Sequence, residues 1–197
     1  RETTTMKLLL GLIQPDGGNI KVLGQKMSPK SRFDINMRTG SLIESPGFYG
    51  HLTGQENLEI IARYKKLGAD DIKEALNTVS LFDRKDDKVK NYSLGMKQRL
   101  GIAMALMGKP ELIILDEPTN GLDPAGINEI RNLIMSIPEK YGSTVIISSH
   151  LLSEVEQIAD YVGIINKGKM IYQGLLSELE IGDASLEEVF LEMTKGA

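Results

Sequence analysis

Two adjacent carboxylates, Asp116 and Glu117, are the strongest chemical signal in the sequence. They follow an apolar run, 112–115, that is typical of a strand buried on both faces of a parallel sheet. Open α/β sheets bind ligands at the carboxyl ends of their strands. Because successive strand residues point to opposite faces, one carboxylate can hold Mg²⁺ while the other addresses a nucleophilic water. A solvated acidic turn is the alternative, and the segment 118–124 that follows makes it the weaker one.

A helix that begins near Ser93 is a candidate for binding phosphate. The free N–H groups and the dipole of a helix start favour an anion, and Gly95 would let that anion approach the backbone closely. An ordinary serine N-cap explains the same residues and is the simpler interpretation of this segment taken alone.

The two histidines have different surroundings. His150 follows the apolar run 145–147 and therefore lies, like the two acids, where a strand is expected to end. A neutral imidazole there can bridge a terminal phosphate and a catalytic water, and a solvated loop histidine is the alternative. His51, beside Gly50, is interpreted as structural.

Thr3, Thr4 and Thr5 open a helix near the start of the sequence. A phosphate loop ends in Gly-Lys-Ser/Thr, with the hydroxyl on Mg²⁺ and a helix beginning at that point. Arg1 and Glu2 stand where this glycine and lysine would be expected, and the glycines that should precede them are not in the sequence.

Periodicity and turn signals predict the elements that must position these residues. The first part should contain a helix, a turn, a short strand and a further extended piece, at 3–12, 14–18, 19–23 and 41–44. From 45 to 108 the pattern predicts helix after helix, with capping boxes expected at Thr53 with Glu56 and at Asp71 with Glu74. This block is interpreted as a helical subdomain inserted in the chain.

After Pro110 the pattern returns to α/β. The apolar runs 112–115 and 145–147, each expected to be buried on both faces, flank a helix predicted over 126–137. This order predicts a strand–helix–strand crossover. The other expected elements are a hairpin and a closing helix, at 161–172 and 186–193.

Composition and charge exclude several classes of function. Lys and Arg number 23 against 27 Asp and Glu, a formal net charge of −4, which disfavours a generally basic surface for nucleic acid. The absence of cysteine excludes disulfides, thiolate catalysis and zinc–cysteine sites. Because no apolar run approaches the roughly 20 residues that span a bilayer, we expect any link to a membrane to go through a partner.

Together these segments resemble the ATP-binding subunit of an ABC transporter. Residues 93–98 (Ser-Leu-Gly-Met-Lys-Gln) are similar to the family signature LSGGQ, from which Leu94 and Met96 depart. Residues 112–117 resemble the Walker B motif, and 121–123 resemble the D-loop. His150 resembles the switch histidine, and the order of all these motifs fits the family.

The resemblance implies an α/β fold: a P-loop NTPase (RecA-like) core with a parallel sheet, plus an inserted α-helical subdomain. The core would comprise 1–44 and 109–197, without the N-terminal strands and most of the phosphate loop. The subdomain would comprise 45–108 and carry the signature motif. We expect the missing part to be omitted from the sequence rather than truly deleted, with a similar gap near 181–183.

Glu44 stands where the family has the glutamine of the Q-loop. With its neighbours 45–49 and 52–58, it resembles the bacterial bacitracin and lantibiotic self-protection exporters, a subgroup that often carries glutamate at this place.

The resemblance also implies roles around the nucleotide. Thr3 would supply a Mg²⁺-binding hydroxyl, with Thr4 nearby on the phosphates. Asp116 would hold Mg²⁺ through water, and Glu117 would act as general base or orient the attacking water. Glu44 would sense Mg²⁺ and water, while its loop faces the membrane subunit.

Further implied roles reach across a dimer. His150 would contact the γ-phosphate of bound ATP. Asp123 would contact the other subunit, and the signature residues would close on the ATP bound there: Ser93, Gly95 and Gln98. Hydrolysis would therefore need two cassettes, most simply in a homodimer.

The function implied is an ATP-hydrolysing subunit, with ATP and Mg²⁺ as cofactors, that powers export of a peptide antibiotic or similar compound. Its other partner would be a transmembrane permease, which would hold the subunit at the cytoplasmic face of the membrane, and no nucleic acid is expected. One alternative is an ABC-type ATPase acting on DNA or ribosomes, although the usual coiled coils, tandem cassettes and basic extensions are not found. A catalytically impaired interaction module is the other, if the phosphate loop is truly deleted.

Overall fold

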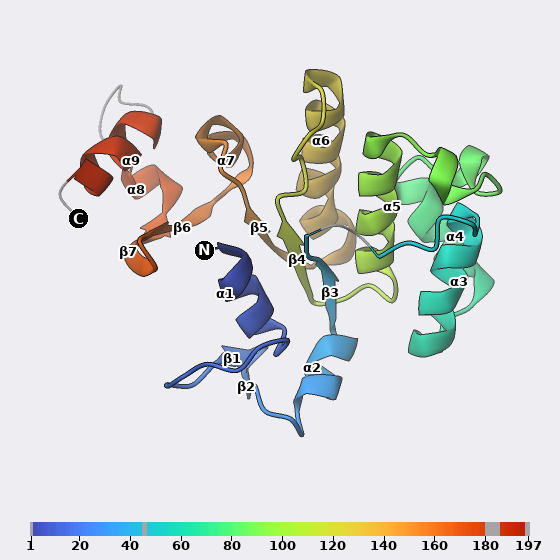
Figure 1. Ribbon diagram of the computed structural model, residues 1–197, viewed down its shortest axis with the longest axis horizontal. Coiled ribbons are helices and arrows are strands. Elements are labelled where there is room, and N and C mark those ends of the chain that lie inside the picture. Colours follow the sequence, from blue (N-terminus) through green and yellow to red (C-terminus); the bar gives the residue numbers. More distant parts are fainter. Residues whose placement is uncertain (1, 45–46, 180–185, 196–197) are drawn as a thin grey trace.

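The structure, a computed structural model, describes residues 2–44, 47–179 and 186–195 (Figure 1). Its centre is a parallel sheet in the order β3 (Thr39–Leu42), β4 (Leu112–Asp116) and β5 (Thr144–Ser148). Every residue of β4 is buried, as its unbroken apolar run predicts. The buried strand therefore fixes the position of its last residue, Asp116.

Alternate side chains of β4 enter two different hydrophobic clusters. Leu112 and Ile114 pack with residues of α1 (Glu2–Leu9) and α2 (Arg32–Met37). Ile113 and Leu115 pack with residues of α5 (Leu94–Leu106) and α6 (Pro124–Tyr141). The period of two along a strand thus places helices on both faces of the sheet.

β5 differs from the prediction that it is buried on both faces. Val145, Ile146 and Ile147 are only half-buried. Among the strands of the described ranges, β5 pairs with β4 alone, so that its outer edge carries no strand partner. The composition of 145–147 suits an interior strand, and its position at the edge explains the exposure.

The segment between β3 and β4 forms the predicted helical block. It contains α3 (Gly54–Lys65), α4 (Ala69–Thr78), α5 and two short 3₁₀ turns, at Phe82–Arg84 and Val89–Asn91. The capping box at Thr53 is present: Thr53 Oγ1 accepts from the Glu56 N–H, and Glu56 accepts from the Thr53 N–H.

The second expected capping box, at Asp71 with Glu74, is wrong. α4 begins three residues earlier than that box requires, at Ala69, because Gly68 takes the N-cap position in an extended conformation. Asp71 lies inside the first turn, and its carboxylate accepts the Gly68 N–H at 2.9 Å. A carboxylate in the first turn of a helix can accept a hydrogen bond from an otherwise free N–H, and its negative charge interacts favourably with the helix dipole.

The ends of other elements also differ from their predictions. α1 stops at Leu9, because Gly11 takes a φ of +64° and terminates the helix. The strand expected at 19–23 is only β1 (Lys21–Val22), which pairs with β2 (Gln25–Lys26). α6 is longer than expected and runs through Pro138 to Tyr141.

The crossover and the C-terminal elements agree with the predictions. α6 connects the parallel strands β4 and β5. After α7 (Leu152–Ile158), the chain forms the hairpin β6 (Tyr161–Asn166) and β7 (Lys169–Leu175). The short α8 (Leu176–Leu179) and the closing α9 (Leu186–Lys195) pack against this hairpin. The gap expected near 181–183 lies outside the described residues.

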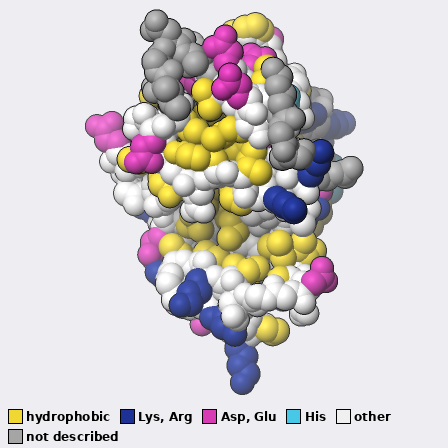
Figure 2. Space-filling model, turned by 90° about the vertical axis from the view of Figure 1, so that its left-hand side faces the viewer, with side chains coloured by type: hydrophobic (Ala, Val, Ile, Leu, Met, Phe, Trp, Pro, Cys, Tyr) yellow, Lys and Arg dark blue, Asp and Glu magenta, His cyan; other side chains and the backbone are white. Residues whose placement is uncertain are grey.

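Apolar side chains gather on the side of the molecule that carries α1 and the two hairpins (Figure 2). In the second hairpin, Tyr161, Met170 and Leu175 are 58%, 53% and 45% exposed. In the part of the chain that the structure describes, none of the helices has the length and apolar character needed to cross a membrane.

Gly40 is the point where the helical block rests on the sheet. A Cβ added at Gly40 would lie 1.9 Å from the carbonyl oxygen of Ala105 on α5. Only glycine allows this approach, since a carbon and a backbone oxygen cannot come so close without displacement. The position of α5, which begins at the signature segment, therefore depends on the absence of a side chain at Gly40.

We predict that Gly40→Ala will push α5 away from β3 and lower the free energy of unfolding by about 1–3 kcal/mol, as overpacking does. Urea unfolding of the variant measures the change. Gly17→Ala is the control, because nothing lies within 4 Å of a Cβ added there. Equal effects of the two variants would contradict this role for Gly40.

Candidate nucleotide and metal site

The carboxyl ends of β4 and β5 bring three of the sequence-predicted residues together. Asp116 is the last residue of β4 and pairs in register with Ser148 of β5. Glu117 follows Asp116, and His150 follows Ser148 by two residues. Glu117 Oε2 lies 2.6 Å from His150 Nδ1. An acid and an imidazole thus face each other at one edge of the sheet, the place that open α/β folds use for ligands.

Asp116 is held by a residue that the sequence reasoning did not select. The Ser148 hydroxyl donates to Asp116 Oδ1 at 2.6 Å, and both residues are 4% exposed. The Glu117 N–H donates to Ser148 Oγ at 3.0 Å. The signal that could have found Ser148 is the register of the two parallel strands, which places it beside Asp116.

The start of α1 lies close to the two acids. Desolvation raises the pKa of the Glu2 carboxyl above its ordinary value, and the negative charges of Glu117 and Asp116 raise it further. Thr3, half-buried, and Thr4, exposed, follow Glu2 in the first turn of α1. The helix start therefore carries hydroxyl groups, but it also carries an acid at the position where a phosphate loop has lysine.

Glu44 is bound to α1 and not to the other predicted acids. It follows β3, takes a φ of +57°, and is exposed. Its Oε1 lies 2.6 Å from Nζ of Lys7. Lys7 was not selected from the sequence, because the pairing depends on how β3 and α1 pack together. An exposed ion pair of this kind contributes little to stability, so Glu44 can exchange Lys7 for another partner at small cost.

The signature residues form a separate group at the start of α5. Ser93 is the N-cap, and its Oγ accepts from the Met96 N–H at 3.2 Å, which is the ordinary serine capping that the sequence allowed. Gln98 is buried, and its Oε1 has no hydrogen-bond partner. Gly95 is half-buried. A buried amide oxygen without a donor is uncommon and marks a position that a ligand or water can satisfy.

Asp123 lies at the N-terminus of α6, beside the signature segment. Its Oδ1 accepts from the Gly126 N–H at 2.9 Å, and Leu94 Cδ2 would lie 3.2 Å from a Cβ at Gly121. Over the described ranges, no hydrogen bond or ion pair links this group to the acids at the strand ends. Within the described residues, the signature segment and the strand-end acids therefore make different sets of hydrogen bonds.

A buried pair behind the site connects its loops. Thr119 Oγ1 donates to Glu154 Oε2 at 2.8 Å, and both side chains are buried. This bond joins the segment after Glu117 to α7, the helix after His150. The sequence reasoning missed it, since neither residue stands out without knowledge of the packing.

The oxygen ligands present suit a hard cation. Mg²⁺ binds through one or two carboxylates together with substrate phosphates rather than in a complete protein cage. The buried Asp116 carboxylate and the Thr3 hydroxyl carry oxygen atoms of the type that such a site uses. Among the residues that the structure describes, no group of three or more acidic or histidine side chains is arranged to hold a metal ion.

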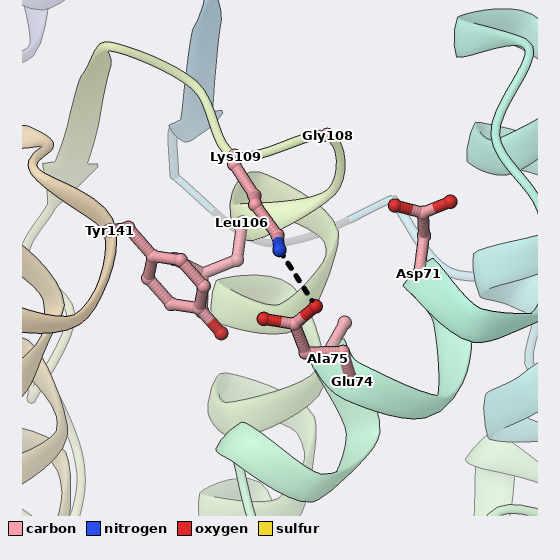
Figure 3. Close-up of a pocket in the computed structure, with 7 residues that line it drawn as sticks. All are labelled: Asp71, Glu74, Ala75, Leu106, Gly108, Lys109 and Tyr141. Carbon is pink, nitrogen blue, oxygen red and sulfur yellow. Dashed lines mark ion pairs between the residues drawn. The ribbon is translucent and has the colours of Figure 1, made fainter.

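Two hollows elsewhere contain none of the predicted site residues. A cavity of about 10 Å³, large enough for one water at most, lies between α4, α5 and α6 (Figure 3). Lys109 points across it toward Glu74, with Nζ and Oε2 3.0 Å apart. A larger hollow of about 270 Å³ lies beside the β1–β2 hairpin and is lined in part by Ile13, Met27 and Arg32.

The sequence matches the ABC transporter family over residues 2–120. It is 51% identical over 174 residues to the bacitracin transport ATP-binding protein BcrA of Bacillus licheniformis, an alignment that covers 86% of this chain and 56% of that protein. It is 43% identical over 189 residues to the lantibiotic transport ATP-binding protein SrtF of Streptococcus pyogenes, covering 96% of this chain and 79% of the relative.

A solved ATP-binding subunit of an ABC transporter superposes with a TM-score of 0.84 at 27% identity, covering 98% of this chain and 82% of that one. The chain spans a little over half the length of the BcrA proteins it matches, 56% and 58%. The family match covers more than half of the sequence, and the solved structure shares its α/β architecture. The chain belongs to the ATP-binding domains of the ABC transporter family.

Proposed function

We propose that the chain binds and hydrolyses ATP and that this reaction powers an exporter of a peptide antibiotic or a similar compound. The observation that carries the proposal is the 2.6 Å contact between Glu117 Oε2 and His150 Nδ1 at the edge of the parallel sheet. The likeness to BcrA and SrtF, which are named for bacitracin and lantibiotic transport, supports the choice of cargo.

Each residue of the strand-end group has a part in the proposed reaction. Asp116 and Thr3 are the residues that would hold Mg²⁺, which when bound neutralises the charge of the phosphates. Glu117 accepts a proton from the attacking water or orients that water toward the γ-phosphate. His150 keeps the Glu117 carboxylate in place through Nδ1 and contacts the γ-phosphate. Glu44 leaves Lys7 to reach the metal and the water.

We further propose that two chains complete one site. In the described part of the chain, Ser93, Gly95 and Gln98 share no hydrogen bond with the strand-end acids, which supports this because one chain could then offer each group to a different nucleotide. Asp123, exposed at the start of α6, contacts the partner. In this arrangement 1–44 and 109–197 act as the core, and 45–108 acts as the helical subdomain that carries the signature to the partner.

The remaining proposed partner is a transmembrane permease, which would hold the protein at the cytoplasmic face of the membrane. The names of the relatives, which describe ATP-binding proteins of transport systems, support this partner rather than DNA or a ribosome. An exposed aromatic residue, Tyr49, follows Glu44 in the loop that we assign to the permease.

We predict that Glu117→Gln will retain ATP binding and reduce hydrolysis by a factor of at least about 100, since the amide cannot accept the water proton. Phosphate release and nucleotide titration measure the two effects. Glu139→Gln, which removes an exposed carboxylate of α6, is the control. Unchanged turnover in Glu117→Gln would refute the proposed role.

Loss of the signature hydroxyl should affect the dimer rather than the single chain. Ser93→Ala removes both the N-cap and the group proposed to meet the partner's ATP. We expect a decrease of about tenfold or more in turnover, with nucleotide affinity of the monomer nearly unchanged. Ser136→Ala, on the exposed side of α6, is the control. A parallel loss of monomer affinity would contradict the two-chain site.

The acid at the start of α1 should make stability depend on pH. Because the pKa of Glu2 is raised in the folded protein, its ionisation costs stability as the pH rises through and above the ordinary value of 4.5. We therefore expect Glu2→Gln to stabilise the protein at about pH 7 and to have no effect at about pH 3.5. Thermal unfolding of both proteins across this pH range tests the prediction. A difference in melting temperature between the variant and the unmodified protein that does not change with pH would contradict it.

A further inference from the structure

Ser148 makes three contacts to the two acids that the proposed reaction uses. Its hydroxyl donates to Asp116 Oδ1 at 2.6 Å, and its Oγ accepts from the Glu117 N–H at 3.0 Å. The carbonyl oxygen of Ser148 accepts from the same N–H at 3.2 Å. A hydroxyl has one proton and two lone pairs, so it can serve the carboxylate and the amide at the same time.

The backbone of Glu117 needs such a restraint. Its φ is +50°, in the left-handed region that residues with a side chain normally avoid. A conformation of this kind persists only where the surroundings impose it. The hydroxyl and carbonyl oxygens of Ser148 both accept from the Glu117 N–H. They thereby fix the backbone of Glu117 and the direction in which its side chain extends from the backbone.

The strand register explains why residue 148 can do this. Ser148 pairs with Asp116 in the parallel ladder, so that its side chain lies against the last residue of β4. The hydroxyl is sequestered from water, because Ser148 is 4% exposed. A hydrogen bond in such a place is not readily replaced by one to solvent. His150, two residues farther along the same strand end, then meets Glu117.

We propose that Ser148 is a positioning residue. It fixes the backbone conformation of Glu117 and the orientation of the Asp116 carboxylate, and it thereby holds the Glu117 carboxylate against His150 in the geometry that the reaction uses. The inference rests on the proposed ATP hydrolysis for its effect on turnover. Its geometric part is independent of that function and can be measured without nucleotide.

The matched substitutions are Ser148→Thr and Ser148→Val, which add the same volume but keep or remove the hydroxyl. Ser148→Ala is the smaller variant. Ser143→Ala is the control, because Ser143 is 3% exposed and its hydroxyl donates to the Pro110 carbonyl at 2.6 Å, before the opposite end of β5. It loses a comparable buried hydrogen bond without touching Glu117.

The first measurement is amide hydrogen exchange by NMR on the labelled chain in the absence of nucleotide. Loss of the Ser148 hydroxyl should accelerate exchange at Glu117 by about five- to tenfold relative to Ile114, the effect of one lost hydrogen bond. Ser148→Thr and Ser143→Ala should leave this ratio near that of the unmodified protein. If Ser148→Ala and Ser148→Val exchange no faster at Glu117 than Ser143→Ala, the proposal is overturned.

The second measurement is hydrolysis of ATP with Mg²⁺. Loss of the hydroxyl should lower kcat about 10- to 100-fold, with KM changed little, and Ser148→Thr should restore turnover. Normal turnover in Ser148→Val would overturn the catalytic part of the proposal. If neither the unmodified chain nor its nucleotide-bound dimer hydrolyses ATP, the proposed function fails, and the exchange experiment still decides the geometric part.

Discussion

The pairing of β4 with β5 is the constraint on which the strand-end site depends. β4 is buried along its whole length between two helical layers, so it cannot slide or rotate without exposing apolar surface. The parallel register then places Ser148 beside Asp116, and the residues that follow each strand meet above the sheet edge. A shift of the β4–β5 register by one residue would change which residues pair at the strand ends and would separate Glu117 from His150.

Much of this geometry could be predicted from the sequence because the relevant segments obey simple rules. The unbroken apolar run ahead of Asp116 predicted a buried strand, and parallel strands with a helix between them were expected to end at one edge. The cap at Thr53 and the start of α5 at Ser93 also followed from residue type and spacing. These are local signals, which can be interpreted from residue type and spacing without knowledge of the tertiary packing.

Other features could not be predicted, because they depend on contacts between distant segments. The apolar run 145–147 has the composition of an interior strand, yet among the described strands β5 pairs with β4 alone and lies at the edge of the sheet. The hydrogen bonds of Ser148 and the ion pair of Lys7 with Glu44 need the register and packing of the folded chain. The expected cap at Asp71 failed for a different reason, since Gly68 and Asp71 provide a competing start for α4.

The roles proposed for the site residues rest on the resemblance of their motifs to those of the family. Within the described chain, the strand-end acids and the signature segment contact different neighbours, which fits a reaction that begins only when two molecules meet. In the proposed function, such a division would couple nucleotide binding to contact between subunits. The free energy of closing around the triphosphate could then move an attached membrane protein.

The outer edge of β5 has a practical consequence for anyone who handles this chain in solution. Among the described strands only β4 pairs with residues 144–148, so their outer edge has backbone donors and acceptors without a strand partner. These residues carry β-branched side chains and have no lysine, proline or bulge to discourage another strand. Extended peptides or neighbouring molecules can add to such an edge and grow into fibrils. Keeping samples dilute, and monitoring light scattering, thus belongs in every preparation of the isolated chain.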